Sequence, residues 1–113
     1  MLPKKYRLND FWEIERVKKG GRLFQSSSFG VLVFYGNEKQ NSRIAFVVSL
    51  KIAKRSVERN RAKRLLSEAV RGFLPLIKPG YDLVFLIKKN LIGKNRQEVE
   101  KEVERIFKIG KLI

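Results

Sequence analysis

The sequence predicts an α+β fold, a two-layer sandwich in which helices cover one face of a four-stranded mixed sheet. Three observations predict it: four short apolar runs of strand-like composition, three segments of helical periodicity, and the order in which they alternate. That order is α-β-β-β-α-β-α. Because 113 residues is an ordinary length for one domain and no long linker divides the chain, residues 1–113 are expected to form a single domain.

The three helices are expected from their end signals and their apolar spacing. The first is capped by Asn9, runs to about Lys18 and ends at Gly20-Gly21. The second starts near Ser56, where apolar and basic residues separate onto different sides of a helix. The third opens at Asn95-Arg-Gln-Glu98, which has the form of a capping box. Its apolar stripe consists of Val99, Val103, Ile106 and Phe107.

The four strands are expected from runs rich in Val, Ile and Phe. A brief strand at Leu23–Phe24 precedes the serine run Ser26–Ser28. A flexible loop is the simpler interpretation of this run, and a site that offers hydroxyl groups to phosphate is the alternative. Phe29–Tyr35 and Arg43–Ser49 are predicted to form a hairpin around the polar, turn-prone loop between them. The fourth strand, Asp82–Ile87, follows a Pro-Gly turn.

The net charge of +15, from 26 Lys and Arg against 11 Asp and Glu, narrows the class of partner. Self-repulsion of that size persists where something anionic offsets it, either nucleic acid or an acidic membrane surface. A merely soluble basic surface is the simplest alternative, but in so short a chain the charge favours nucleic acid, and hence an RNA-binding or DNA-binding domain. The sequence has no apolar run of membrane-spanning length and no signal-peptide core, so we expect a cytoplasmic protein with no membrane partner.

The chain contains no Cys and no His. These absences exclude a disulfide framework, a thiol nucleophile and a cysteine-based zinc site, and they remove the commonest general base and metal ligand. Catalysis by the protein's own side chains would have to rest on carboxylates, Lys, Tyr or Ser. These absences count against catalysis and metal binding by the protein itself, and we predict no catalytic residue and no metal site in it.

The segment from Lys51 to Arg71 carries the strongest functional signal. Its predicted helix separates an apolar side from a polar and basic side that surrounds a single Asn. A charge run is usually a solvated surface. Here, however, the few acids do not neutralise the run, and Arg, which can bind phosphate through two hydrogen bonds, outnumbers Lys. The apolar side consists of Ala62, Leu65, Leu66, Ala69, Val70 and Phe73; the opposite side consists of Asn60, Lys63, Arg64, Ser67 and Arg71, with Arg59 and Arg61 on the flanks.

Arg59-Asn60-Arg61, followed by Lys63-Arg64, resembles the RNR motif of the bacterial ribonuclease P protein component family. The strand Arg43–Ser49 is similar to the one that leads into that motif, and Lys51 stands where the family carries a lysine before the helix. The likeness extends over about residues 4–107. Further similar stretches are Arg7-Leu8 and Asp10-Phe11 near the start and Tyr81–Val84 in the last strand.

The resemblance implies a ribosomal protein S5 domain 2-like fold with a left-handed βαβ crossover around the basic helix, against the usual handedness. It also implies the protein subunit of a ribonucleoprotein that removes the 5′ leader of precursor tRNA. The expected partners are the catalytic RNA subunit of ribonuclease P, which would carry the chemistry, and precursor tRNA, with no obligate protein partner evident. The expected cofactor is Mg²⁺, held mainly by the RNA subunit. The residues that match the RNA-contacting motif are Lys51, Arg59, Asn60, Arg61, Lys63 and Arg64, and the basic segment adds Lys54, Arg55 and Arg71.

Phe11 matches an aromatic residue of the cleft in which the family cradles the single-stranded leader, between the sheet and the first helix. Phe34 and Tyr35 are further candidates for this cleft, because unpaired bases stack on aromatic rings beside basic groups. The competing interpretation is that such rings fill the core of a small domain. Three positions depart from the family pattern: Ser67 replaces a frequent Arg, Glu15 replaces a second cleft aromatic, and Leu50 interrupts a common Ser-Lys-Lys.

Two alternatives remain open at this point. A non-catalytic structured-RNA-binding protein of ribosomal type would share the same composition. Paired carboxylates such as Glu98 and Glu102 could bind Mg²⁺ in an autonomous nuclease, although a helix cap and pairs within the helix explain them more simply. The missing His and the separation of these acids from the basic segment count against a nuclease.

Overall fold

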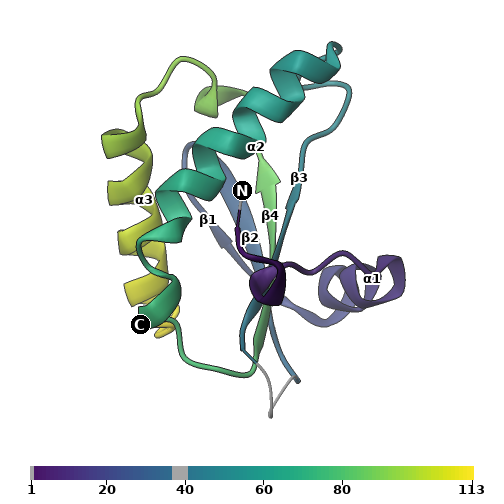
Figure 1. Ribbon diagram of the computed structural model, residues 1–113, viewed down its shortest axis with the longest axis vertical. Helices are drawn as coiled ribbons and strands as arrows, with labels where there is room; N and C mark the ends of the chain where they lie inside the picture. Colours follow the sequence, from purple (N-terminus) through teal and green to yellow (C-terminus); the bar gives the residue numbers. More distant parts are fainter. Residues whose placement is uncertain (1, 37–40) are drawn as a thin grey trace.

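The computed structural model describes residues 2–36 and 41–113. Within these ranges the elements follow the predicted order, with three short 3₁₀ turns added (Figure 1). The helices are α1 (Phe11–Gly20), α2 (Ser56–Arg71) and α3 (Arg96–Ile109); the strands are β1 (Arg22–Gln25), β2 (Phe29–Tyr35), β3 (Arg43–Val47) and β4 (Tyr81–Ile87); the 3₁₀ turns are η1 (Lys4–Tyr6), η2 (Leu74–Leu76) and η3 (Lys89–Leu91). The α+β prediction is confirmed, while most of the predicted loop between β2 and β3 lies outside the described residues.

The sheet is mixed, with the strand order β1-β2-β4-β3. β2 lies antiparallel to both β1 and β4, whereas β3 runs parallel to β4. The predicted hairpin between β2 and β3 is therefore wrong, because β4 lies between them. Residues 82–85 of β4 are all buried, so this strand needs cover on both faces and takes a central position. β3, α2 and β4 form the predicted parallel crossover, whose handedness stays a prediction.

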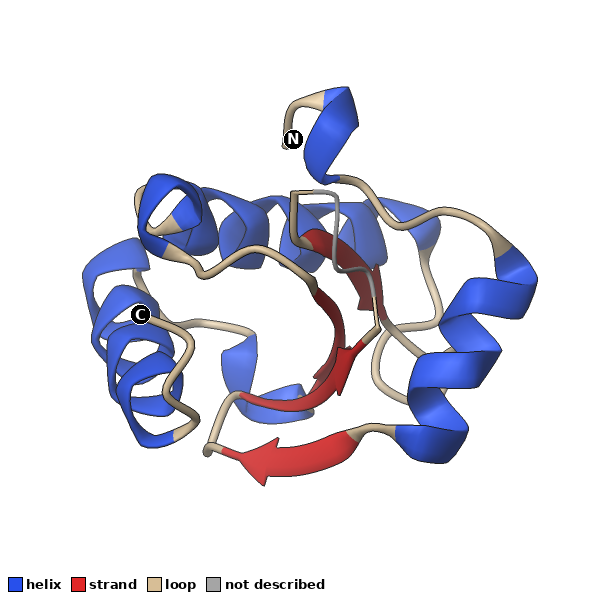
Figure 2. Cartoon of the chain, turned by 90° about the horizontal axis from the view of Figure 1, so that it is seen from below, coloured by secondary structure: helices blue, strands red, loops and turns tan. Residues whose placement is uncertain are grey.

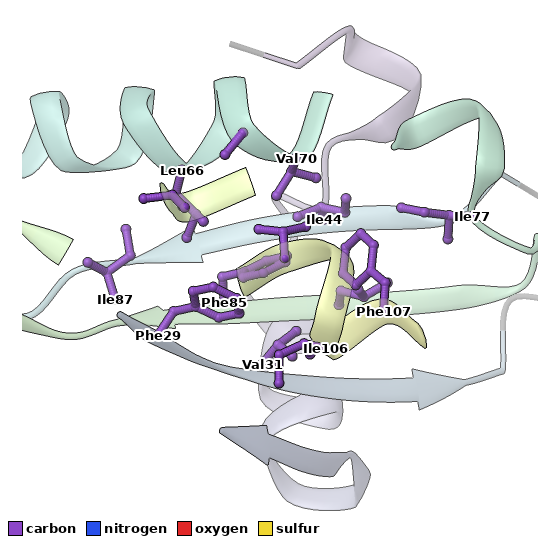
Figure 3. Packing of buried hydrophobic residues seen from close by; sticks show 14 of the residues in the cluster. Phe29, Val31, Ile44, Leu66, Val70, Ile77, Phe85, Ile87, Ile106 and Phe107 are labelled. Carbon is purple, nitrogen blue, oxygen red and sulfur yellow. The ribbon is translucent and has the colours of Figure 1, made fainter. Parts of the chain in front are cut away.

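Helices cover both faces of the sheet. α2 and α3 pack on one face, over a core to which the strands contribute Phe29, Val31 and Phe85 (Figure 3). α1 packs on the opposite face, in a smaller cluster with Val84 and Leu32 (Figure 2). The two-layer arrangement is thus confirmed for α2 and α3, but α1 does not share their face. The reason is that β2 and β4 carry apolar residues on both faces, and each face has to be covered.

Local capping sets where the helices begin. The carboxylate of Asp10 accepts a hydrogen bond from the backbone N–H of Glu13 (3.1 Å), so the cap of α1 is Asp10 rather than the predicted Asn9. The capping box of α3 is confirmed: Asn95 accepts from the N–H of Glu98 (2.9 Å), and Glu98 accepts from the N–H of Asn95 (3.2 Å). Within the described residues, no helix has the length and apolar content needed to cross a membrane.

The N-terminal segment is held at two points. Leu2 is buried in the core cluster that contains residues of α2 and α3. Further on, Arg7 forms a parallel bridge with Ile44 on the outer edge of β3, where the N–H of Leu8 donates to the carbonyl of Ile44 (2.9 Å). This pairing covers part of a sheet edge that would otherwise be open.

Candidate nucleic-acid interface

The apolar side of α2 is anchored in the core, as the sequence predicts. Of the six residues assigned to that side, four are buried and two are half-buried. The buried ones are Ala62, Leu66, Ala69 and Val70; the half-buried ones are Leu65 and Phe73. The helix is therefore held rigidly on the sheet, and its outer side is presented as a fixed surface.

Ser67 does not belong to that outer side. It is only 1% exposed, and its hydroxyl donates to the carbonyl of Arg64 (2.9 Å), so its placement beside Arg64 on the exposed side is wrong. The reason is that the N-terminal segment and β3 flank this side of α2. Lys63, which lies one turn before Ser67 on the same side of the helix, lines a hollow with Arg7 and Ile44. The buried arc is wider than the apolar residues alone indicate.

Most of the predicted RNA-binding residues are exposed to solvent, either on α2 or in the loop before it. The exposed ones are Lys51, Lys54, Arg55, Asn60, Arg61, Arg64 and Arg71, whereas Arg59 and Lys63 are half-buried. Among residues 2–36 and 41–113, no basic side chain of this set forms an ion pair. The positive charge of α2 is therefore not neutralised by the described part of the protein.

Arg59 differs from its neighbours because it also supports the backbone. Its Nη1 atom donates to the carbonyl of Ala53 (3.1 Å) and to that of Lys54 (2.7 Å). These hydrogen bonds tie α2 to the loop before it. Arg59 therefore fixes the position of Lys54 and Arg55, two other residues of the predicted interface.

Phe11 and Phe34 are brought together on the face of the sheet that α1 covers. They line a hollow of about 640 Å³ with Trp12, Arg16 and Lys19. Phe11 and Trp12 are 60% and 77% exposed and pack edge to face, with ring centroids 5.2 Å apart. The guanidinium of Arg16 lies 5.0 Å from the centroid of the Phe34 ring. Exposed rings beside cations are features of surfaces on which unpaired bases stack.

The structure does not bring Tyr35 to this surface. Side chains alternate along β2, so Tyr35 lies on the opposite face of the sheet from Phe34. There it packs edge to face against Tyr81, with ring centroids 5.1 Å apart. Glu15, the departure from the family pattern on α1, lines the hollow of Phe11 and Phe34.

A buried acid joins α1 to the sheet. Asp82 has no exposed surface and accepts hydrogen bonds from Arg43, at 3.1 Å from Nε and 2.9 Å from Nη2. Arg43 also pairs with Glu13 at 2.6 Å, and Arg16 reaches Asp82 at 3.4 Å, so one charge network connects α1, β3 and β4. The hydrogen bond to Asp82 raises the pKa of Arg43 by more than burial lowers it. Sequence reasoning missed this network, although an acid inside the apolar run of β4 was its signal.

The serine run binds a carboxylate of the protein itself. Glu102 of α3 accepts hydrogen bonds from the hydroxyls of Ser26, Ser27 and Ser28 and from the backbone N–H of Ser28 (3.0 Å). Lys94 forms an ion pair with the same carboxylate at 3.1 Å. Burial raises the pKa of Glu102, but the hydrogen bonds from the serines and Lys94 together outweigh burial and lower it to about 2. The serine run lies in the loop between β1 and β2, as the simpler interpretation predicts, and its hydroxyls donate to an internal carboxylate and not to a phosphate.

The fold and these surfaces define a class: a small α+β protein with a rigid, unneutralised basic helix of the kind that binds nucleic acid. The family model described as Ribonuclease P matches residues 2–110. The chain therefore belongs to the family of bacterial ribonuclease P protein components. It is a protein subunit of the ribonuclease P ribonucleoprotein, accessory to an endoribonuclease of tRNA processing, and its partner is RNA.

Relatives and solved structures agree with this assignment. The ribonuclease P protein component of Synechocystis sp. is 32% identical over 94% of this chain and 86% of its own length. That of Clostridium kluyveri is 38% identical over 91% of this chain and 92% of its own length. The RNase P protein of Staphylococcus aureus matches the fold with a TM-score of 0.82 at 23% identity, covering 96% of this chain and 98% of that one. The RNase P protein from Thermotoga maritima has a TM-score of 0.79 at 25% identity, covering 91% and 96%. The predicted family and fold class are confirmed.

Proposed function

We propose that α2 and the loop before it dock on the catalytic RNA of ribonuclease P. The observation that carries this proposal is the set of exposed basic side chains around Asn60, which form no ion pair with any described residue of the chain. Arg and Lys on a rigid helix neutralise phosphates without first breaking internal pairs. Because the opposite side of α2 is packed in the core, docking requires no rearrangement of the fold.

The surface around Phe11 and Phe34 is proposed to hold the single-stranded 5′ leader of precursor tRNA. Phe11 and Trp12 offer exposed rings for stacking, and Arg16 and Lys19 lie beside them for leader phosphates. α1 and α2 lie on opposite faces of the sheet, so one protein can contact the catalytic RNA on one side and the substrate leader on the other. The protein thereby extends the substrate contacts of the RNA and leaves bond cleavage to it.

We further propose that the Mg²⁺ associated with this reaction is held mainly by RNA phosphates. The best-placed acids of the protein do not fit a magnesium site. Glu102 is already bound by serine donors, Asp82 by Arg43, and Glu98 by the backbone of the α3 cap. Mg²⁺ needs oxygen ligands that are free to coordinate it, and phosphates supply them.

Reconstitution with the catalytic RNA of the same genome tests the proposal. Adding the protein should raise the rate of 5′ maturation of precursor tRNA at low Mg²⁺, and the protein alone should not cleave. An unchanged rate relative to RNA alone would overturn the proposal, as would specific cleavage by protein free of RNA.

A matched pair of variants tests the leader surface. Phe11→Ala should weaken binding of precursor tRNA with a long leader by about tenfold, since stacking contributes ~1–3 kcal/mol per base. It should leave a substrate with a one-nucleotide leader unaffected. Tyr35→Ala removes a ring of similar exposure, 58% against 60%, from the opposite face and should leave both substrates unaffected. Equal losses in the two variants would contradict the assignment of the leader to the α1 face.

A further inference from the structure

A second hollow adjoins α2, on the side away from the N-terminal segment. It has a volume of about 330 Å³ and lies between the first turns of α2 and the chain that follows β4. In Figure 1 this chain is the light green segment beside α2. Of the residues that line it, only Arg61 belongs to the family motif, and none lines the leader surface. Its principal lining residues are Glu58, Arg61, Leu65, Leu91, Ile92 and Lys94.

The hollow combines an apolar floor with a charged rim. Leu91 is fully buried, Leu65 is half-buried, and Ile92 is 49% exposed at the opening. Glu58 and Arg61 stand three residues apart on α2 and are both exposed. Within the described ranges neither forms an ion pair, with the other or with any other residue. An acceptor and a donor are therefore available at the rim.

The far wall of the hollow is held in place by the serine run. The Nζ atom of Lys94 donates to the hydroxyls of Ser27 and Ser28, each at 2.7 Å, and pairs with Glu102. Lys94 therefore cannot swing into the hollow without breaking these contacts. A site whose walls are fixed in advance loses less conformational freedom when a ligand enters.

We propose that this hollow takes up one unpaired nucleobase of the catalytic RNA bound along α2, a proposal that rests on the proposed function. Apolar walls suit the faces of a base, and Arg61 suits its phosphate. The net charge of the whole chain, +15, favours an anionic polymer over a peptide or an apolar ligand. The carboxylate of Glu58 can only accept hydrogen bonds, so it favours a base with an amino group on its edge, which means adenine, cytosine or guanine. Uracil is disfavoured because its one imino N–H stands between two carbonyl oxygens, which repel the carboxylate.

Chemical probing of the reconstituted complex tests the proposal. The base edges of the catalytic RNA are modified with and without protein, at equal occupancy. One unpaired, amino-bearing nucleotide should be protected by the wild-type protein. Ile92→Ser, which removes the apolar wall at the opening, should restore its reactivity and weaken RNA binding by about tenfold, because the apolar contact with the face of the base is lost. Ile109→Ser, at an isoleucine of similar exposure on α3, should do neither.

A second pair of variants isolates Glu58. Loss of a negative charge near RNA should tighten binding slightly through general electrostatics, and Glu68→Gln, two to three turns along α2, should show that effect alone. Glu58→Gln should instead weaken binding several-fold, because a neutral amide oxygen accepts a weaker hydrogen bond from the base than the carboxylate does. Equal tightening by both variants would overturn the role of Glu58.

The two proposals fail in different ways. If the wild-type protein binds the catalytic RNA but protects no unpaired nucleotide, the hollow is not a base site and the proposed function stands. If the wild-type protein does not bind the catalytic RNA at all, both proposals are overturned.

Discussion

Two groups of basic residues in this protein share the same chemistry and have different surroundings. Arg43, Arg16 and Lys94 are bound to acids that hold α1, the sheet and α3 together. Arg61, Arg64 and Arg71 on α2 are exposed and form no ion pair with any described residue. The first group acts within the fold and the second is available to RNA. Residue type and net charge do not distinguish the two groups. What distinguishes them is whether an acidic side chain lies within reach of each basic one.

The largest expected effect on stability comes from the first group, in which basic residues are bound to acids. Asp82→Ala should lower the free energy of unfolding by about 3 kcal/mol, because it leaves the largely buried Arg43 guanidinium without its main partner. Urea denaturation followed by circular dichroism measures this loss. Arg71→Ala, which removes an exposed charge from α2, should change stability by less than about 0.5 kcal/mol. Similar losses in both variants would erase the distinction between the groups.

The Glu102 site should make stability depend on pH in a defined window. An acid whose pKa falls on folding stabilises the protein above its ordinary pKa of 4.5, and that contribution is lost as pH falls towards about 2. Glu102→Gln should therefore cost about 2 kcal/mol at pH 7, after allowance for solvent screening, and almost nothing near pH 2. Thermal unfolding of both proteins between pH 7 and pH 2 measures the difference. Glu104→Gln, on the exposed side of α3, should show no such convergence.

Ser67 offers a test of where the outer side of α2 ends. Ser67→Arg would add a phosphate contact if the position were exposed. Because it is buried, the variant should instead lose about 2 kcal/mol of stability by overpacking and by burial of a charge. Unfolding and RNA affinity are measured together. Tighter RNA binding at unchanged stability would show that this side of the helix is open.

The smallest expected effects on stability are those of two arginines on α2, which should differ in how they support the fold. Arg59→Ala should cost about 1 kcal/mol, because it breaks two hydrogen bonds to the preceding loop, and it should also weaken RNA binding. Arg64→Ala should leave stability unchanged and weaken RNA binding several-fold. It should also reduce the slope of log affinity against log salt by about 1. A salt titration of both variants checks this, and an unchanged slope for Arg64→Ala would remove it from the interface.

Much of the fold could be predicted because the signals were local. The third helix follows from its capping box and apolar stripe, and the strands follow from composition. The pairing of β2 with β4 could not be predicted in the same way, because the choice of a sheet neighbour depends on burial of the whole strand. A hairpin of β2 with β3 was predicted because these strands are joined by a short loop, but β2 pairs with β4 instead.

The candidate interface could also be predicted in part, because the helical period of α2 is a local signal. The period of α2 placed its apolar side correctly and with it the outward direction of Arg64. It could not show that the N-terminal segment flanks the helix, and so Ser67 was misplaced. The network of Asp82 and the carboxylate site of the serine run join residues far apart in sequence, and they depend on tertiary contacts that no local pattern contains.

The bridge between Arg7 and Ile44 bears on how the protein avoids self-association. β3 is an edge strand, and an exposed edge can pair with the edge of another molecule and start aggregation. Here the chain's own N-terminal segment occupies part of that edge, and Leu2 fastens the segment to the core. The N-terminal segment thus acts as a cover for part of the β3 edge, and this cover limits pairing of the sheet with another molecule.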